Sequence, residues 1–250
     1  MKAIIVAAGR SSRLYPLTLK TPKCLLAIGG TSIVERSIDL LRAAGVQEIV
    51  VVAGFCQEQI RSRLHGRAHV VLNPFYAQTN NMASLWLALP HVRGDDALYL
   101  HGDVIYHQAL LERLAAGRAP AGIQLLTDFD SVDDEAMKVR VADGRFVESS
   151  KAIPLDQAAG EWTGLARISA AATGPLYSCV ESLLAEQRFQ DYDTVAFNHL
   201  ARAGMTFRLT PTGGLPWCEI DTHADLERAR ALFDPMPGRV AVLTTELTEK

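Results

Sequence analysis

Long apolar runs are missing from this chain of 250 residues. A membrane-spanning helix needs about 20 consecutive apolar residues, and no segment approaches that length. The apolar run near the start, residues 3–7, is also too short to form the core of a signal peptide. We therefore expect a cytoplasmic protein without a membrane partner.

Closely spaced cysteines and an excess of positive charge are also lacking. The 4 cysteines lie far apart without a C-x-x-C pair, which argues against a zinc site or a disulfide framework. The net charge of -3 argues against a nucleic-acid partner, because proteins that bind nucleic acids usually concentrate basic residues to neutralise phosphates. The 7 histidines show no H-x-x-H or H-E-x-x-H spacing, so we interpret all of them, His101 included, as structural.

The order of the apolar segments predicts the fold class. With 48% hydrophobic and 21% charged residues, the chain can bury one substantial core. Apolar runs at residues 3–7, 48–53, 68–72 and 97–101 predict buried strands, and the helical spacing of apolar residues between them predicts helices. Strands that alternate with helices in this way form a parallel sheet that the helices cover.

A different pattern begins after residue 123. Segments 137–141 and 145–149 flank Asp143-Gly144, a pair that is typical of the tight turn in an antiparallel hairpin. We predict an α/β fold, in which a parallel sheet covered by helices carries this antiparallel hairpin insertion. The remaining predictions are a single domain over 1–232, a strand at 163–168, helices at 176–187, 194–203 and after Thr222, and a tail at 233–250 of unknown role with an extra strand at 240–245.

The loop after the first strand carries the residues that are most informative about function. Ala7, Ala8 and Gly9 are small, so backbone N–H groups there can approach a triphosphate closely, while Arg13 and Lys23 supply fixed positive charge. A glycine turn alone is equally typical of an ordinary structural loop. Together with the basic residues, however, it predicts a cradle for an anion.

Carboxylates stand at two predicted strand ends. Asp103 comes after the strand at 97–101, and Asp221 precedes the last predicted helix. Ligands of open α/β sheets bind at the carboxyl ends of the strands, and Mg²⁺ takes one or two carboxylates together with substrate phosphates, so we interpret this pair as a Mg²⁺ site. Each acid alone has a structural alternative, a turn residue for Asp103 and a helix-start charge for Asp221. We assign Glu219 to a supporting position beside the metal ligands.

The string A-A-G-R-S-S-R-L at residues 7–14, with P-K at 22–23, resembles the signature of the sugar-phosphate and choline-phosphate nucleotidyltransferases, A-A-G-x-G-[ST]-R-[LM]…P-K. Ser11 stands where that family usually has its second glycine. The later landmarks H-G-D at 101–103 and E-I-D-T-H at 219–223 follow in the family's order, so the resemblance spans most of the chain. It implies a Rossmann-like, nucleotide-diphospho-sugar transferase-like fold, with a mixed, mostly parallel sheet and a first loop that wraps the nucleotide.

A narrower resemblance concerns the base of the nucleotide. The residues from Asn73 to Leu85 resemble the N-x-x-Y…N-N-x-x-S-L segment of choline-phosphate and 2-aminoethylphosphonate cytidylyltransferases. This implies that Asn80 and Ser84 lie near the base and that the nucleotide is CTP. The alternatives are a plain helix cap for Asn80 and a small packing residue for Ser84.

Further residues are assigned to the acceptor. Lys151 lies in a segment similar to the family's E-K-P, whose lysine contacts the acceptor phosphate, and Lys138 resembles a lysine of the phosphonate-directed branch. An exposed strand lysine is the alternative for Lys138. Glu161 and Asp193 are carboxylates suited to a cationic head group, and a neighbouring aromatic residue such as Trp162 could form a wall around that cation, with core packing as the alternative.

The resemblance implies a Mg²⁺-dependent nucleotidyltransferase that transfers CMP from CTP to a small phosphate or phosphonate monoester, such as 2-aminoethylphosphonate or phosphocholine, and releases pyrophosphate. Arg13, Lys23 and Lys151 are the expected catalytic residues. Two alternatives stay open: a sugar-1-phosphate nucleotidyltransferase, and a nucleotide-binding regulatory module without catalysis. The sequence leaves open the identity of the acceptor and the oligomeric state, a homodimer included.

Overall fold

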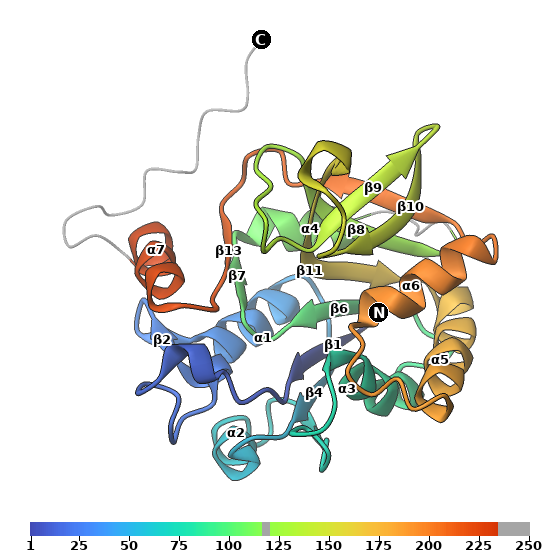
Figure 1. Ribbon diagram of the computed structural model, residues 1–250. Coiled ribbons are helices and arrows are strands. Elements are labelled where there is room, and N and C mark those ends of the chain that lie inside the picture. The colour runs from blue at the N-terminus through green and yellow to red at the C-terminus, as the bar shows by residue number, and fades with distance from the viewer. Residues whose placement is uncertain (117–120, 235–250) are drawn as a thin grey trace.

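A computed structural model describes residues 1–116 and 121–234 of the chain (Figure 1). At its centre β1 (Lys2–Ala7) lies between β4 (Glu48–Ala53) and β6 (Ala97–His101), and β5 (His69–Leu72) pairs with β4 at the edge. All of these pairs are parallel. The three central strands are mostly buried on both faces, which is why their apolar residues form continuous runs without alternation.

The other half of the sheet is mainly antiparallel. β11 (Gly160–Ile168) runs antiparallel to β6 on one side and to β8 (Ile123–Asp128) on the other. β12 (Phe207–Pro211) then pairs with β8 in the parallel direction, so the sheet, which has 9 strands among the described residues, is mixed. This arrangement confirms the predicted mixed α/β fold.

The predicted hairpin consists of β9 (Lys138–Ala142) and β10 (Arg145–Ser150), and β9 joins the end of β11. Asp143 and Gly144 take φ angles of 49° and 71°, the left-handed conformation that a two-residue hairpin turn requires. In Figure 1 the hairpin rises above α6 at the upper right of the sheet. The hairpin prediction is therefore confirmed.

Helices cover both faces of the sheet, because each presents one apolar face to it. Buried side chains from both kinds of element form one hydrophobic cluster on each side of the sheet. One side is covered by α3 (Asn81–Ala88), α5 (Ala170–Ala185) and α6 (Asp193–Arg202), and the other by α1 (Ile33–Ala43), α2 (Gln57–Arg63) and α4 (Gln108–Ala115).

A small separate layer brings the end of the domain next to its centre. β7 (Val104–Tyr106), which follows β6, pairs antiparallel with β13 (Trp217–Glu219). The Ile220 backbone N–H then donates to the Asp103 carbonyl oxygen at 3.0 Å, so the residues after β13 lie beside those after β6. The short strands β2 (Ala27–Ile28) and β3 (Thr31–Ser32) lie on the same side of the molecule, where β2 contacts α7.

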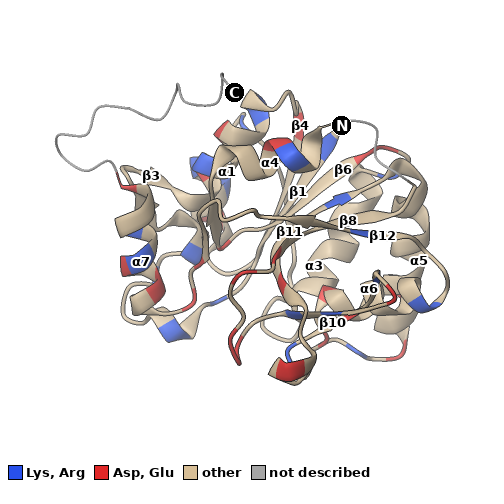
Figure 2. Cartoon of the chain, turned by 90° about the horizontal axis from the view of Figure 1, so that it is seen from above, with Lys and Arg blue, Asp and Glu red and all other residues tan. Residues whose placement is uncertain are grey.

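The last described helix, α7 (His223–Phe233), begins as predicted at Thr222. The Thr222 side chain accepts from the Asp225 backbone N–H, and the Asp225 carboxylate accepts from the Thr222 backbone N–H, which forms a complete capping box. Figure 2 shows basic and acidic residues along α7, two pairs of which are bonded within the helix. The predicted strand at 240–245 lies outside the described residues.

Several elements differ from the sequence predictions. α4, β2, β3, β8, β12 and the β7–β13 pair were not predicted. β7 and β13 have only 3 residues each, and β12 shows little burial. α5 begins at Ala170, earlier than predicted, with Pro175 inside it. Proline removes one backbone hydrogen bond there, while the buried residues Ala172 and Leu176 keep the helix packed on the sheet. Among the described helices, none has the length and apolar character needed to cross a membrane.

Candidate active site

Three carboxylates meet at the carboxyl end of the central sheet. Asp103 follows β6, while Glu219 ends β13 and Asp221 comes two residues later, on the same face of the extended chain. One oxygen from each carboxylate lies within 4.8 Å of the others. The pairing of β7 with β13 causes this convergence, because it places the two chain segments side by side. A compact set of oxygen ligands suits Mg²⁺.

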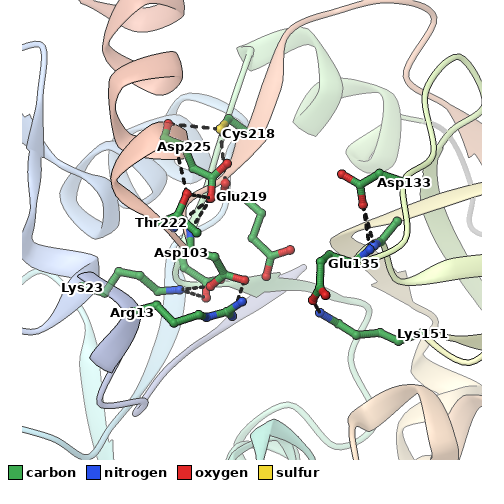
Figure 3. Close-up of polar contacts among 12 residues, drawn as sticks. Arg13, Lys23, Asp103, Asp133, Glu135, Lys151, Cys218, Glu219, Thr222 and Asp225 are labelled. Carbon is green, nitrogen blue, oxygen red and sulfur yellow. Dashed lines mark hydrogen bonds and ion pairs between the residues drawn. The ribbon is translucent and has the colours of Figure 1, made fainter. Parts of the chain in front are cut away.

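Two cations of the first loop approach these carboxylates (Figure 3). The Lys23 Nζ lies 2.7 Å from Asp103 Oδ2 and 2.8 Å from Asp221 Oδ1, and a terminal nitrogen of Arg13 lies 2.6 Å from Asp221 Oδ2. Burial opposes the charge of Lys23, but the two carboxylates outweigh burial and raise the pKa of its amine. The structure therefore brings together Arg13, Lys23, Asp103 and Asp221, the four residues that the sequence analysis assigned to the cradle and the metal site.

Glu219 has a larger part in this cluster than the sequence indicated. Burial, followed by repulsion from Asp103 and Asp221, raises the pKa of Glu219 to about 7. Burial beside two other carboxylates makes the ionised form of Glu219 costly, and a cation held between the three carboxylates would offset that cost. The signal in the sequence was the spacing Glu219-x-Asp221 on a strand, which points both side chains to one face.

A cavity of about 290 Å³ opens beside the carboxylates. Its walls include the first loop, the start of α3 and the carboxyl ends of β6 and β13. Of the predicted residues, it is lined by Ala8, Gly9, Arg13, Lys23, Asn80, Ser84, Asp103, Lys151, Trp162, Glu219 and Asp221. We call this space the first cavity.

Ala7 supports the first cavity from behind rather than lining it. A Cβ at Gly102 would lie 2.8 Å from the Ala7 Cβ, so these two small residues let β1 and the end of β6 come close together. Ser11 takes φ 52°, the left-handed conformation in which the related sequences usually have glycine. Its carbonyl oxygen accepts from Thr18 Oγ1 at 2.7 Å, which holds the loop in this shape.

The α3 side of the first cavity is held by side-chain amides. The Asn80 side chain caps α3 and its Nδ2 donates to the Gln190 carbonyl oxygen at 3.2 Å. Ser84 is buried, and its Oγ accepts from Asn73 Nδ2 at 3.1 Å. The helix-cap alternative for Asn80 is thus present in the structure, and both residues also border the cavity.

His101 also lines the first cavity, although we interpreted it as purely structural. Its Nε2 lies 2.9 Å from the Asp193 Oδ2, and a Cβ at Gly164 would lie 2.9 Å from its Nδ1. Burial opposes its charge, but Asp193, with smaller contributions from Asp103 and Glu219, raises the pKa of His101 to about 9. The sequence signal for a place in the cavity was the position of His101 at the end of β6, two residues before Asp103.

The structure does not bring Asp193 to the acceptor side. Its side chain is fully buried at the start of α6, where Oδ2 accepts from the Tyr99 hydroxyl at 2.6 Å and from His101. Its Oδ1 accepts from the Thr194 backbone N–H at 2.9 Å. The prediction that Asp193 contacts the acceptor is therefore wrong. Its side chain, in the first turn of α6, points into the protein rather than into a cavity.

A second cavity, of about 380 Å³, adjoins the first. The residues that line both are Arg13, Lys151, Glu219 and Asp221. Acidic side chains outnumber basic ones in the rest of its wall. These acidic residues are Asp128, Asp133, Glu135, Glu161 and Asp225.

Glu161 and Lys151 line the second cavity as predicted for acceptor residues. Burial, followed by repulsion from Glu219, Asp133 and Asp128, raises the pKa of Glu161 to about 7. The Lys151 Nζ lies 3.8 Å from a carboxylate oxygen of Glu135, on the opposite side from Lys23 in Figure 3. The wall therefore offers the cations Arg13 and Lys151 at the junction and excess negative charge farther away.

Lys138 and Trp162 do not take the positions predicted for acceptor contacts. The Lys138 Nζ is buried and donates to the Asp134 carbonyl oxygen at 2.7 Å and the Lys151 carbonyl oxygen at 2.9 Å, so it holds the cavity wall in place. Trp162 is buried, and its indole ring stacks with Tyr99 in the core. Trp162 therefore packs in the core and also borders the first cavity, but it does not line the second.

Comparisons with known proteins agree with this geometry. The model of the MobA-like NTP transferase domain family matches residues 3–170. The chain is 29% identical to CMP-5'-(3-aminopropyl)phosphonate synthase from Streptomyces rubellomurinus, in a match that covers 94% of this chain and 39% of that protein. It is 26% identical to CTP:phosphoglutamine cytidylyltransferase from Campylobacter jejuni, with 91% of this chain and 98% of that protein covered. The chain thus spans less than half of the first relative and nearly all of the second.

A solved structure gives a similar picture. The inositol-1-phosphate CTP transferase from T. maritima matches with a TM-score of 0.78 and 25% identity, covering 92% of this chain and 95% of that chain. This likeness confirms the predicted fold class.

Proposed function

The chain belongs to the family of MobA-like NTP transferase domains, and we propose that it transfers CMP from CTP to a small phosphate or phosphonate monoester. The observation that carries the proposal is the junction of the two cavities, which Arg13, Lys151, Glu219 and Asp221 share. A nucleotide in the first cavity and an acceptor in the second would meet there, beside the carboxylates. The names of both relatives, which contain CMP or CTP, support the choice of nucleotide.

Asp103, Glu219 and Asp221 would hold Mg²⁺. Their oxygens lie close enough together to share one ion, which would offset the burial and the repulsion that raise the pKa of Glu219. When bound, Mg²⁺ supplies charge neutralisation for the phosphates and helps to fix their orientation. Lys23 and Arg13 add positive charge to the same cluster and would stabilise the departing pyrophosphate.

In the proposed reaction an acceptor oxygen attacks the α-phosphorus of CTP. One P–O bond forms, and the bond from the α-phosphorus to the oxygen that bridges it to the β-phosphorus breaks, so pyrophosphate leaves. A phosphate or phosphonate is already ionised near neutral pH, and no side chain has to remove a proton from it. The residues act by positioning and charge stabilisation, which is the usual source of catalysis in transfers at phosphorus.

The wall of the second cavity supports a short zwitterion as the acceptor. Lys151 at the junction suits the anionic phosphoryl end, whereas Glu161 and its acidic neighbours suit a positive group at the other end. An aminoalkyl phosphonate or a phosphocholine-like molecule has this distribution of charge. An uncharged sugar phosphate would leave the carboxylates without a partner, which disfavours the sugar-1-phosphate alternative.

The regulatory alternative requires that catalytic groups be lost. The ion cluster of Lys23, Asp103 and Asp221 is complete, which argues against this alternative. Phosphorus NMR of the protein with CTP, Mg²⁺ and 2-aminoethylphosphonate tests the proposal directly. We expect a new phosphonate–phosphate anhydride together with pyrophosphate in equal amount. Pyrophosphate without the anhydride would mean that CTP is merely hydrolysed, and would refute the transfer.

A further inference from the structure

The amide of Asn81 has a fixed direction in the first cavity. Asn81 is the first residue of α3 and lines that cavity. Its Oδ1 lies 3.0 Å from the backbone nitrogen of Asp193. A backbone N–H can only donate, so the side-chain atom that faces it must be the oxygen. The Asn81 Nδ2, with its two N–H groups, therefore points away from Asp193.

His101 does not accept a hydrogen bond from this amide. The His101 Nε2 lies 3.3 Å from Asn81 Nδ2 but 2.9 Å from the Asp193 carboxylate. That carboxylate already accepts from Tyr99 and Thr194, and an ionised carboxylate is only an acceptor, so Nε2 carries the proton and donates it to Asp193. Within residues 1–116 and 121–234, Asn81 Nδ2 therefore has no acceptor of its own.

A donor without a partner in a nucleotide cavity selects for an acceptor atom on the ligand. We propose that Asn81 distinguishes cytosine from uracil, and that Asp193 is the positioning residue that fixes its direction. In cytosine the ring atom N3 carries a lone pair, whereas in uracil the same atom carries a proton. An N–H group of Asn81 can bond the first and opposes the second.

Asp193 acts in two ways, although it does not touch the ligand. Its backbone N–H fixes the Asn81 oxygen, and its carboxylate keeps the His101 Nε2 proton engaged. In Asp193→Asn the acceptor of this proton is weakened, and the unprotonated Nε2 of His101 can then accept from Asn81. The donor would be lost to the ligand while the fold of the cavity remains.

The inference rests on the proposed function. Equilibrium binding of nucleotides tests the inference separately from the transfer reaction, because binding needs no acceptor. The Kd values of CTP, UTP and 2′-deoxy-CTP are to be measured for the wild type and for Asn81→Asp, Asn81→Ala and Asp193→Asn. Asn81→Asp keeps the oxygen that faces Asp193 and replaces the donor by an acceptor. Asp191→Asn is the matched control, because it removes the same charge from an acid two residues before Asp193, and that acid pairs with Arg188 instead.

For the wild type we expect a preference for CTP over UTP on the order of 10²-fold. Asn81→Asp and Asp193→Asn should lower this ratio about tenfold or more, and Asp191→Asn should leave it unchanged. In turnover assays, Asp193→Asn should raise the KM for CTP and leave the KM for the acceptor unaltered. Thermal melts identify any variant that fails to fold, and Asn81→Ala provides a second test at the same position.

Two results would overturn the inference. One is an unchanged ratio of CTP to UTP affinity in folded Asn81→Asp and Asp193→Asn. The other is a lower ratio of CTP to 2′-deoxy-CTP affinity in these variants, with the ratio of CTP to UTP affinity unchanged, which would mean that Asn81 contacts the ribose. A wild type that binds CTP selectively but yields no CMP adduct with any acceptor would refute the proposed function and leave the inference standing.

Discussion

Replacing Lys23 by alanine tests the charge balance of the carboxylate cluster. The side chain of Lys23 is only 10% exposed, and its amine contacts two carboxylates at 2.7 Å and 2.8 Å. Removal of one partner from a buried ion cluster costs roughly 3–5 kcal/mol. Asp103 and Asp221 retain 25% and 21% exposure, so water offsets part of this loss and we expect a value near the lower limit. For a domain of this size about 3 kcal/mol lowers the Tm by roughly 6–12 °C.

Mg²⁺ should restore part of the stability that the Lys23→Ala variant loses, because the ion can balance the negative charge of the two carboxylates in place of the lysine. An ion at about 100 times its Kd stabilises a folded protein by about 2.7 kcal/mol. We expect the Tm of Lys23→Ala to rise more on addition of Mg²⁺ than the Tm of the wild type, as measured by calorimetry. Lys20→Ala is the matched control, since that lysine is exposed in the same loop. A Lys23→Ala variant that melts like the wild type, or that does not respond to Mg²⁺, would refute the reasoning.

The remaining predictions concern the site residues one by one. Asp103→Ala and Asp221→Ala should each abolish turnover while the protein stays folded, and activity above about a tenth of the wild type at saturating Mg²⁺ would exclude that acid as a metal ligand. Lys151→Ala should raise the KM of every acceptor, whereas Glu161→Gln should raise it only for acceptors with an ammonium group; equal effects on neutral acceptors would make Glu161 structural. The pKa of Glu161 is raised to about 7, so the affinity for such acceptors should increase as the pH rises through 7 and the carboxyl ionises, and this increase should vanish in Glu161→Gln. Gly164→Ala should destabilise the protein by about 1–3 kcal/mol, because φ is +79° there and the new Cβ would approach His101, and a denaturant midpoint equal to that of the wild type would contradict this.

Local patterns in the sequence were sufficient for the central strands and for the hairpin. The apolar runs of β1, β4 and β6 are continuous because both faces of these strands are buried, and Asp143-Gly144 is the residue pair that a two-residue turn prefers. By contrast, β7 and β13 are too short to leave a periodic pattern. Their pairing depends on contacts between residues more than 100 positions apart, which no local signal contains.

The same distinction separates the site residues that the sequence placed correctly from those that it did not. Lys23 and Asp103 stand at predictable positions, a loop after one strand and the end of another. The roles of Lys138 and Asp193 depend on the direction of a side chain, and a buried lysine that donates to two carbonyl oxygens has the same local sequence as an exposed one. Glu219 was assigned to a supporting role because its crowding with Asp103 arises only in the folded chain.

Pyrophosphate release by the wild-type protein in Mg²⁺, measured for CTP, UTP, ATP and dTTP with each of a small set of acceptors, tests the central claim most directly. The set should contain 2-aminoethylphosphonate, phosphocholine and a sugar 1-phosphate. We expect release with CTP that depends on a zwitterionic acceptor and is much slower with the sugar phosphate. Comparable or faster release from UTP or dTTP with the sugar 1-phosphate, release that does not depend on any acceptor, or no release at all would contradict the account.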